Sequence, residues 1–469
     1  MRRAAFALVV LLCAVPLRAQ QPTPAEVAAE DPADEKGKIA KNCLFKHVVG
    51  CLEVLFTGQP LHIAVGSLPP QNGFAYGLAY VGRKDTKSGN WRISWNGDAA
   101  LSSSRSWRGG LYVNFVDSRI SQAEVDMGTG NANMADIRAY IEQPVYTLYV
   151  QTISLNKLTM FGLGPETLES GRSYYGMSET VAGASGVRPI YSHLNMGVYG
   201  EINGRSVDVR PSPNQESPSI EQLYGPADAP GLNDHPFFLQ LGAGVRMRPS
   251  DSKKRLHLNY DVAYRPFFDT SGSELSFQRL TVDLGHELSL YHTHMRVPRD
   301  TNGPDDCAID PGDARSRCQP IAKTSTKEGS IGFRAFTSLS RTSSANAVPF
   351  YFQPTVGGAD INGNNVLGSY QDYRFRARNL LLLRESFEHS FGKLPVGFIM
   401  LADQAKLANA AGDLGRAPWI QSYAAGITLR AGGLPIISLL FAFGGHEGTH
   451  TILNMGASLL GSSGRPSLF

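Results

Sequence analysis

After its first residues the sequence lacks any long apolar run, and no later stretch approaches the roughly 18–20 continuous apolar residues of a membrane helix. It also lacks a charge excess, because 44 Lys and Arg stand against 41 Asp and Glu, which argues against a dedicated nucleic-acid surface. Cysteine is scarce, with five residues. A transmembrane β-barrel remains compatible with all three shortages, since its strands need only about 9–11 residues each and alternate apolar with polar positions.

The amino-terminal 60 residues divide into two predicted segments. Residues 1–19 have a basic start, a short apolar core and the small residue Ala19 at the end, which predicts a secretory signal peptide. Residues 20–60 begin with a Pro-, Ala-, Glu- and Asp-rich linker. A short amphipathic helix follows within residues 39–56, where apolar residues recur at mostly helical spacing.

Four cysteines remain once the signal peptide is removed. Cys307 and Cys318 bracket a polar segment with Pro and Gly, and in an oxidising compartment we expect them to form a disulfide. Cys43 and Cys51 in one continuous helix would be about 12 Å apart along the axis, beyond disulfide reach. Either that helix breaks near Gly50, or these two cysteines stay reduced.

From Leu61 onward the apolar period changes to two, which is typical of amphipathic strands. A soluble sandwich would bury the apolar face of such strands, whereas a membrane barrel would expose it to lipid and direct its Arg and Asp face into a lumen. The number of strands and the signal peptide favour the barrel. The predicted strands are Phe74–Val81, Trp91–Ala99, Leu111–Asp117, Val145–Leu155, Leu194–Tyr199, Phe237–Met247, Leu256–Tyr264, Leu280–Leu284, Ser330–Leu339, Tyr423–Arg430, Ile436–Phe443 and Ile452–Leu460.

The segment from Gln353 to Lys406 combines a Gly- and Asn-rich loop, three arginines at every second residue, and two apolar runs. In an extended segment positions two apart share one side, so the arginines should project together and need carboxylates or water. They are Arg374, Arg376 and Arg378.

The order of these parts resembles the carboxy-terminal barrel of the BamA/TamA superfamily of outer-membrane insertases and translocases, the bacterial surface antigen family. In that family the sixth extracellular loop has a Leu/Val-Arg-Gly-Phe/Tyr tip that folds back into the barrel, and a following strand carries Phe-x-Asp-x-Gly. The corresponding residues here are Leu367, Gly368, Ser369 and Tyr370 at the tip, and Leu401, Ala402, Asp403, Gln404 and Ala405 in the strand. The chain departs from the family by lacking the tip arginine and both glycines.

The resemblance implies an all-β fold, a transmembrane antiparallel β-barrel of 16 strands over residues 61–469, with a short N-terminal helical extension and without the family's periplasmic modules. It places the chain in the outer membrane of a Gram-negative cell, in contact with lipid and with unfolded outer-membrane or secreted proteins that it inserts or translocates. The alternative is a passive channel or a structural surface protein. The helix within residues 39–56 is expected to pack under the barrel; the alternative is a remnant of a periplasmic module.

The resemblance also implies that the loop Thr342–Arg378 is extracellular and docks inside the barrel against Asp403. Because Gly368 replaces the tip arginine, Arg374 or Arg376 is the expected partner of that carboxylate. The alternative is that these charges pair as in any polar lumen. Strand parity then makes the connection over residues 296–328, with Cys307 and Cys318, periplasmic.

Two further patterns suggest metals but predict turns. The segment 446–450, HEGTH, matches the zinc-protease pattern HExxH, which needs a helix; here it follows two glycines between strand-like runs and predicts a hairpin turn. Asp360, Asn362 and Asn364 have the spacing of a calcium loop, but Asn365 stands where that loop needs Gly and Gln371 where it needs Glu. We therefore predict no metal, no cofactor and no catalytic site.

Overall fold

The computed structural model describes residues 61–117, 144–191, 194–212, 218–249, 256–293, 327–391 except 361 and 363, 396–431 and 434–455. The predicted signal peptide (1–19) and the predicted linker and helix (20–60) lie outside these residues. Cys43, Cys51, Cys307, Cys318 and residues 296–326 also lie outside them, so the disulfide stays a prediction.

The described chain is built almost wholly of strands. The strands are β1 (Leu61–Ser67), β2 (Phe74–Asp85), β3 (Trp91–Ser102), β4 (Trp107–Asp117), β5 (Val145–Met160), β6 (Ser173–Tyr191), β7 (Met196–Pro211), β8 (Phe237–Met247), β9 (Leu256–Asp269), β10 (Phe277–Thr293), β11 (Lys327–Arg341), β12 (Thr355–Val356), β13 (Phe375–Arg376), β14 (Asn379–Ser390), β15 (Val396–Ala408), β16 (Ile420–Ala431), β17 (Leu434–Gly445) and β18 (Gly448–Met455). The helices are α7 (Ile220–Leu223) and the 3₁₀ turns η1 (Glu169–Gly171), η3 (Phe350–Phe352) and η4 (Ala411–Asp413). None of the described helices is long and apolar enough to cross a membrane.

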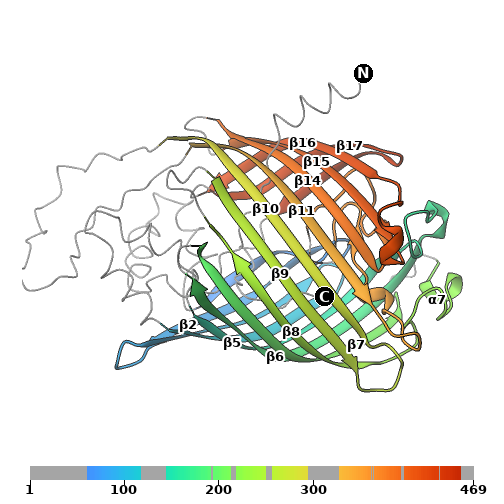
Figure 1. Ribbon diagram of the computed structural model, residues 1–469, viewed down its shortest axis with the longest axis horizontal. Coiled ribbons are helices and arrows are strands. Elements are labelled where there is room, and N and C mark those ends of the chain that lie inside the picture. Colours follow the sequence, from blue (N-terminus) through green and yellow to red (C-terminus); the bar gives the residue numbers. More distant parts are fainter. Residues whose placement is uncertain are drawn as a thin grey trace, which may run out of the picture.

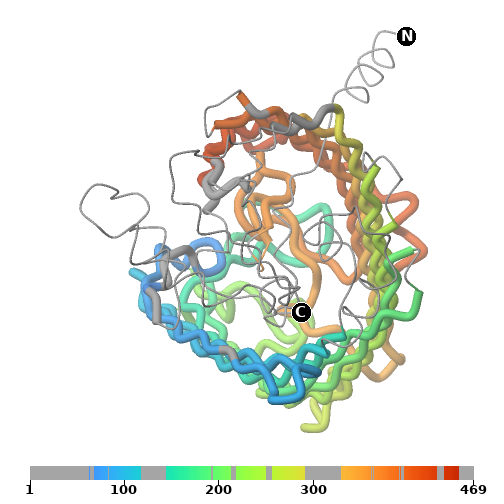
Figure 2. The backbone as a smooth tube through the Cα atoms, turned by 90° about the vertical axis from the view of Figure 1, so that its left-hand side faces the viewer, coloured from blue at the N-terminus to red at the C-terminus, as the bar shows by residue number. Residues whose placement is uncertain are grey.

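Sixteen of these strands form one antiparallel meander, in the order β1 to β11 and then β14 to β18, and this confirms the predicted all-β fold with 16 strands. The sheet curls around an interior, as the side and end views show (Figures 1 and 2). The two-residue strands β12 and β13 pair with each other in a separate small sheet. They belong to the long connection between β11 and β14, part of which lies within the ring of strands in Figure 2.

The wall carries its apolar side chains on the outside. On β2, Leu78 is 55% exposed while its neighbour Ala79 is 1% exposed, and on β5, Leu148 is 52% and Thr147 is 6% exposed. Charged residues predicted for the polar face pair on the inside, as Arg246 and Asp261 do at 3.1 Å. This arrangement is the reverse of a soluble sandwich and is the one that a membrane barrel requires.

Every predicted strand overlaps an observed one, but apolar alternation did not indicate β6 and predicted only the first part of β7. The outward positions of β6 include Ala182, Ala184 and Gly186, and β7 has outward glycines at 200 and 204, so apolar alternation is interrupted. Backbone pairing with β5 and β8 extends both strands regardless. Cross-strand hydrogen bonds therefore decide these elements, and side-chain pattern does not.

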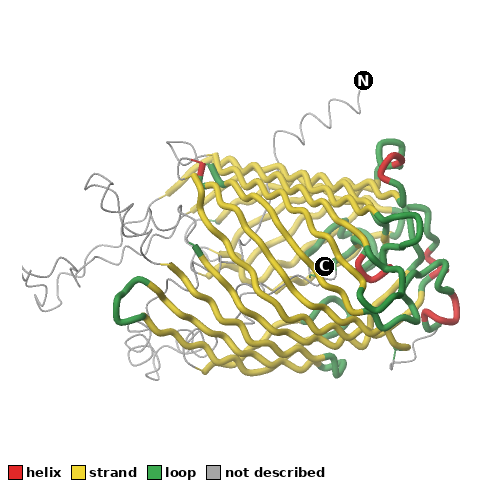
Figure 3. The backbone as a smooth tube through the Cα atoms, turned by 60° about the horizontal axis from the view of Figure 1, so that its bottom comes forward, coloured by secondary structure: helices red, strands yellow, loops and turns green. Residues whose placement is uncertain are grey.

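The longer described connections gather at one end of the barrel, which we call the loop end. It carries residues 161–172, 218–236, 342–378 and 409–419, and Figure 3 shows these loops together on the right. Inside the wall at this end lies an apolar core, in which side chains of β5 to β10 surround the aromatic residues of the 342–378 connection. This connection contains the predicted docking residues.

Candidate functional site

The connection of residues 342–378, called the inner loop below, begins with an aromatic anchor at Phe350, Tyr351 and Phe352. All three side chains are buried, at 0%, 0% and 2% exposure. The ring of Phe350 lies edge-on to Tyr175 of β6 at 5.2 Å, and that of Phe352 lies edge-on to Phe238 of β8, also at 5.2 Å. These rings pack against the wall as side chains do in the core of a soluble protein, and they fix this part of the inner loop at the loop end.

Two arginines satisfy the backbone carbonyls of this aromatic anchor. Arg376 donates to the Phe350 carbonyl at 2.7 Å and to the Tyr175 hydroxyl at 3.0 Å. Arg279 of β10 donates to the Phe352 carbonyl and, from Nε, to Ser340 at 3.2 Å. Because carbonyls buried without partners are costly, these guanidiniums allow a polar backbone turn to sit among aromatic rings.

The predicted tip lies against the opposite part of the wall, on β15 to β18. The Leu367 amide donates to Asp403 of β15 at 2.9 Å, and the Ser369 amide donates to the Ser422 hydroxyl of β16 at 2.9 Å. Leu367 and Tyr370 are both buried in an apolar cluster with residues of β14 and β15. A Cβ added at Gly368 would lie 2.7 Å from Ile452 Cδ1 of β18 and 3.0 Å from Ala442 Cβ of β17, so the tip passes close to this hairpin.

The predicted pairing of Asp403 with Arg374 or Arg376 is wrong, because Asp403 pairs with Arg384. The Arg384 Nε and a terminal nitrogen donate to the two carboxylate oxygens at 2.6 and 2.8 Å. These residues are direct cross-strand partners in the β14–β15 register, so the wall supplies the cation itself. Arg384 also donates to the Asn365 carbonyl of the inner loop. Asp403 and Arg384 together thus hold loop backbone.

Arg374 forms a second polar anchor, with Glu447 as its ion-pair partner. It also donates to the Thr167 hydroxyl at 2.8 Å and to the Thr167 carbonyl at 2.7 Å, in the β5–β6 connection. The Gln371 amide donates to the same glutamate at 3.2 Å. The inner loop is therefore connected both to β5–β6 and to the turn between β17 and β18.

The HEGTH segment is a hairpin turn, as predicted, with Gly445 of β17 paired to Gly448 of β18. Sequence reasoning missed the role of its glutamate in holding the inner loop. The Asp360 segment is also a turn, in which the carboxylate accepts hydrogen bonds from the amide and side chain of Asn364 at 2.7 and 2.9 Å. In the part of the chain that the structure describes, no group of His, Cys, Asp and Glu is arranged to hold a metal.

The three arginines at alternate positions do not act as one cluster. Arg374 stacks on Phe161 and Phe375, with its guanidinium carbon 4.9 and 4.6 Å from the ring centroids. Arg376 is directed to the aromatic anchor, and Arg378 is half-buried. Only Phe375–Arg376 adopt strand structure here, so the extended segment on which the shared-side prediction depended is too short.

The site carries further polar groups that burial perturbs. Asp372, in the inner loop, accepts from the Ala359 amide at 3.1 Å. Burial raises the pKa of its carboxyl, an effect that this hydrogen bond partly offsets. The Tyr373 hydroxyl donates to the Pro70 carbonyl at 3.0 Å, and burial raises the pKa of this phenol well above its ordinary value. Docking of the inner loop is therefore coupled to ionisation of its own side chains.

The first and last strands form the ends of the sheet order. Each strand in the 16-stranded order is hydrogen-bonded to the next one in that order. The described residues show no pairing between β1 and β18, the first and last of these strands. We call the boundary between these strands the seam. The inner loop contacts the hairpin at this boundary twice, at Glu447 and near Ile452.

Comparisons with known proteins give distant structural similarities only. No family model and no curated protein sequence matches the chain. Among solved structures, it is similar to CdiB from Acinetobacter baumannii at 12% identity and a TM-score of 0.43, covering 84% of this chain and 59% of that one. It is similar to BamA from Haemophilus ducreyi lacking POTRA domains 1–3 at 9% identity, TM-score 0.45 and coverages of 85% and 67%. It is also similar to the siderophore receptor PirA from Pseudomonas aeruginosa at 7% identity and a TM-score of 0.33, covering 84% of this chain and 66% of that one.

Proposed function

We propose that this chain is an outer-membrane β-barrel of a Gram-negative cell, and that it inserts or translocates other polypeptides at the seam between β1 and β18. The observation that carries the proposal is the docking of the inner loop against the β17–β18 hairpin at the end of the sheet order, through the Arg374–Glu447 ion pair and the close approach of Gly368 to Ile452. Its partners would be membrane lipid and unfolded outer-membrane or secreted proteins.

A sheet edge that opens within a membrane would provide a chemical reason for this activity. Backbone N–H and C=O groups in hydrocarbon must find partners within protein, since water is absent there. Exposed edges of β1 and β18 would therefore favour addition of an incoming strand by β-augmentation. Such a strand gains backbone hydrogen bonds at the same moment that it enters the membrane.

The inner loop provides a means of controlling this edge. It contacts Glu447 and closely approaches Ile452, and both residues belong to the β17–β18 hairpin, which forms one side of the seam. Its aromatic anchor is fixed to β6, β8 and neighbouring strands on the other part of the wall. In this proposal the docked loop holds the last hairpin in position, and release of its polar contacts frees that hairpin to move.

A passive channel is the second candidate, favoured by the polar inner face of the wall. The apolar core at the loop end argues against it, because Phe350, Tyr351 and Phe352 fill space that a permanent aqueous path would need. Planar-bilayer recording distinguishes the two. We expect brief, irregular conductance from the wild-type protein, whereas a stable ohmic pore would favour the channel.

Locking the seam tests the proposal. We would join β1 to β18 with a reducible thiol-reactive cross-linker between Ile63→Cys and Leu453→Cys, at two exposed outer-face positions, and measure how fast the purified protein makes a small barrel protein fold into liposomes. The control is Leu439→Cys with Leu453→Cys, whose positions are register partners within the paired β17–β18 hairpin.

We expect the cross-linked seam to lower the insertion rate about tenfold and a reductant, which cleaves the linker, to restore it, with little change in the control. Equal rates for the cross-linked and the reduced seam variant would contradict the insertase proposal. No acceleration by the wild-type protein would contradict it as well.

A further inference from the structure

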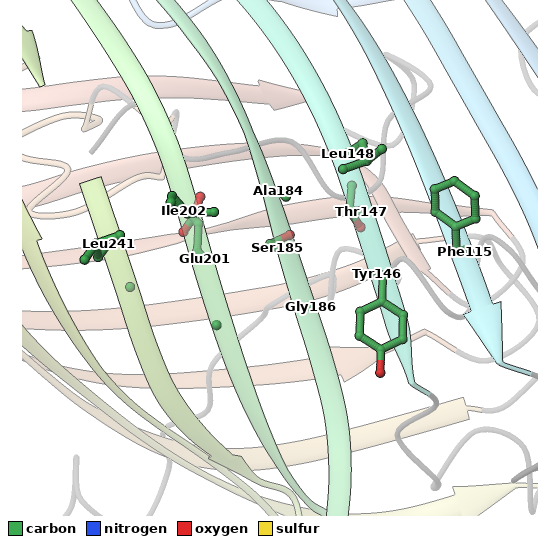
Figure 4. Close-up of a pocket in the computed structure, with 12 residues that line it drawn as sticks. Phe115, Tyr146, Thr147, Leu148, Ala184, Ser185, Gly186, Glu201, Ile202 and Leu241 are labelled. Carbon is green, nitrogen blue, oxygen red and sulfur yellow. The ribbon is translucent and has the colours of Figure 1, made fainter. Parts of the chain in front are cut away.

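A shallow groove of about 580 Å³ lies on the outer face of the wall, across strands β4 to β8. Its floor consists of the small residues Ala184, Gly186 and Gly200. In Figure 4 the side chains of Tyr146 and Leu148 stand on one side of β6 and that of Ile202 stands on the other. This volume lies within the range of about 300–1,000 Å³ typical of small-molecule sites.

Strand register shows that the groove faces outward. Ala184 lies between Leu148 and Ile202 in the register, and Gly186 lies between Tyr146 and Gly200. Side chains at paired positions share one face of a sheet. Because Leu148 and Ile202 are 52% and 50% exposed, the floor belongs to the face that meets lipid.

An exposed arginine lies beyond the groove on β6, on the side away from the loop end. Arg188 follows Gly186 by two residues on the same outer face of β6, beside the outward Val198. A guanidinium on this face is tolerated near the membrane interface and strongly disfavoured at the midplane. The neighbouring contact of Tyr146 with Trp91, at 6.2 Å between ring centroids, is of the kind that marks the interface.

The outer face of β6 continues from Arg188 towards the midplane with small residues only, through Gly186 and Ala184 to Ala182. Six residues of strand span about 20 Å. With a strand tilt of about 35–45°, this length corresponds to a depth of about 15 Å, which is half the hydrocarbon core. This outer stripe of β6, whose middle part Ala184 and Gly186 form the floor of the groove, therefore has the length of one leaflet and has a positive charge at its interfacial end.

We propose that this groove binds one phospholipid, with an acyl chain along β6 and the headgroup phosphate against Arg188. The apolar floor and walls match a hydrocarbon chain, and the guanidinium matches a phosphate through charge-assisted hydrogen bonds. Net-anionic headgroups are preferred over zwitterionic ones, since a zwitterionic headgroup carries its own cation. The site is independent of any activity at the seam.

Native mass spectrometry of the whole protein released from detergent micelles tests this site, with phosphatidylglycerol as the added probe. Gly200→Leu fills the groove from its floor, and the backbone accepts a side chain there because the nearest atom to a Cβ is Gly242 O at 3.8 Å. Gly97→Leu is the matched control on the outer face of β3, where a Cβ would lie 3.7 Å from Leu111. Ala184→Leu is a second filling variant.

We expect either filling variant to bind phosphatidylglycerol about tenfold more weakly than wild type, while Gly97→Leu binds it unchanged. All variants must migrate as folded barrels in unheated gels. Equal binding by Gly200→Leu, Ala184→Leu and the wild type would overturn the proposal. So would capture of a polypeptide, with no lipid adduct, by a photoreactive residue at position 202.

The charge is tested separately with Arg188→Gln. One arginine near an anionic surface contributes about a fivefold preference, so we expect the wild type to favour phosphatidylglycerol over phosphatidylethanolamine by about that factor. Arg188→Gln should lose this preference and keep its acyl-chain binding. Arg341→Gln, an exposed arginine at the loop end, should keep the preference; an equal loss in both variants would overturn the role of Arg188.

Discussion

The two ends of the inner loop are held in physically different ways. The aromatic anchor at Phe350–Phe352 is fixed by ring packing in an apolar core on the side of β5 to β10. The tip and the following residues are held by hydrogen bonds and charges at Asp403 and Glu447, together with a smaller apolar cluster that includes Leu367, on the side of β14 to β18. Apolar burial is lost only when the core opens, whereas individual polar contacts can exchange with water. The comparison suggests a permanent attachment at one end and a releasable one at the other.

Truncating the aromatic anchor should have the largest effect. Phe352→Ala removes a buried ring that contacts Phe238 and Phe267, and such truncations cost about 3–5 kcal/mol. We expect the whole loop end to lose stability, measured as the midpoint of denaturant unfolding in micelles. Phe391→Ala, an exposed ring in the β14–β15 connection, is the control. A smaller shift for Phe352→Ala than for this control would contradict the permanent attachment.

Removing the charge at the other end should have a smaller and more local effect. Glu447→Gln keeps the size of the side chain but weakens a charge-assisted contact with Arg374, worth about 1.5–3 kcal/mol. We expect faster trypsin cleavage after Arg374 with little change in global unfolding. Asp413→Asn removes an exposed charge at the same end and should leave cleavage unchanged. Slow cleavage in both variants would show that this contact does not hold the loop.

The tip can also be displaced by a single methyl group. Gly368→Ala places a Cβ 2.7 Å from Ile452 Cδ1 and 3.0 Å from Ala442 Cβ, and overpacking of this kind costs about 1–3 kcal/mol. We expect higher accessibility of a cysteine probe introduced at Ser369. Gly412→Ala, where a Cβ meets nothing within 4 Å, is the matched control. An unchanged probe in Gly368→Ala would mean that the tip lies elsewhere.

The smallest expected effect is a pH dependence of docking. Burial raises the pKa of Asp372 in the docked loop, so the docked state binds this proton more tightly than the unfolded chain does. The resulting stabilisation is greatest below about pH 4, where an unfolded aspartate titrates, and is lost as pH rises through the raised folded pKa. Asp372→Asn should flatten the pH dependence of the unfolding midpoint, and an equal dependence in both proteins would exclude this group.

Much of the wall could be predicted from the sequence, because apolar alternation is a local property of each strand. Strand β6 could not be, since its outward Ala and Gly residues carry no apolar signal and its pairing comes from β5 and β7. Those same small residues form the groove proposed to bind lipid. The residues that interrupt the apolar alternation of β6 are therefore the ones that form the outer groove.

The site was predictable in place but not in its contacts. The family resemblance directed attention to Leu367 and Asp403, whose backbone–carboxylate contact the structure contains. The partner of Asp403 depended on the β14–β15 register, which alternation does not fix. The HEGTH pattern predicted a turn and no role for Glu447, but from this turn its carboxylate reaches Arg374 of the inner loop. The aromatic run Phe350–Phe352 was a usable signal, since three consecutive rings in a polar loop require burial.

The account depends on the inner loop lying inside the wall in the membrane-embedded protein, and one cross-link tests this directly. The double variant Ser369→Cys, Ser422→Cys joins two positions between which the Ser369 amide nitrogen and the Ser422 hydroxyl oxygen are 2.9 Å apart. The control is Ser369→Cys with Ser330→Cys, because Ser330 lies on β11 at the end of the barrel away from the loop end. We predict that oxidation in liposomes produces a disulfide at 369–422 and none at 369–330. Failure of the first pair to join, or equal joining of both, would contradict a docked loop.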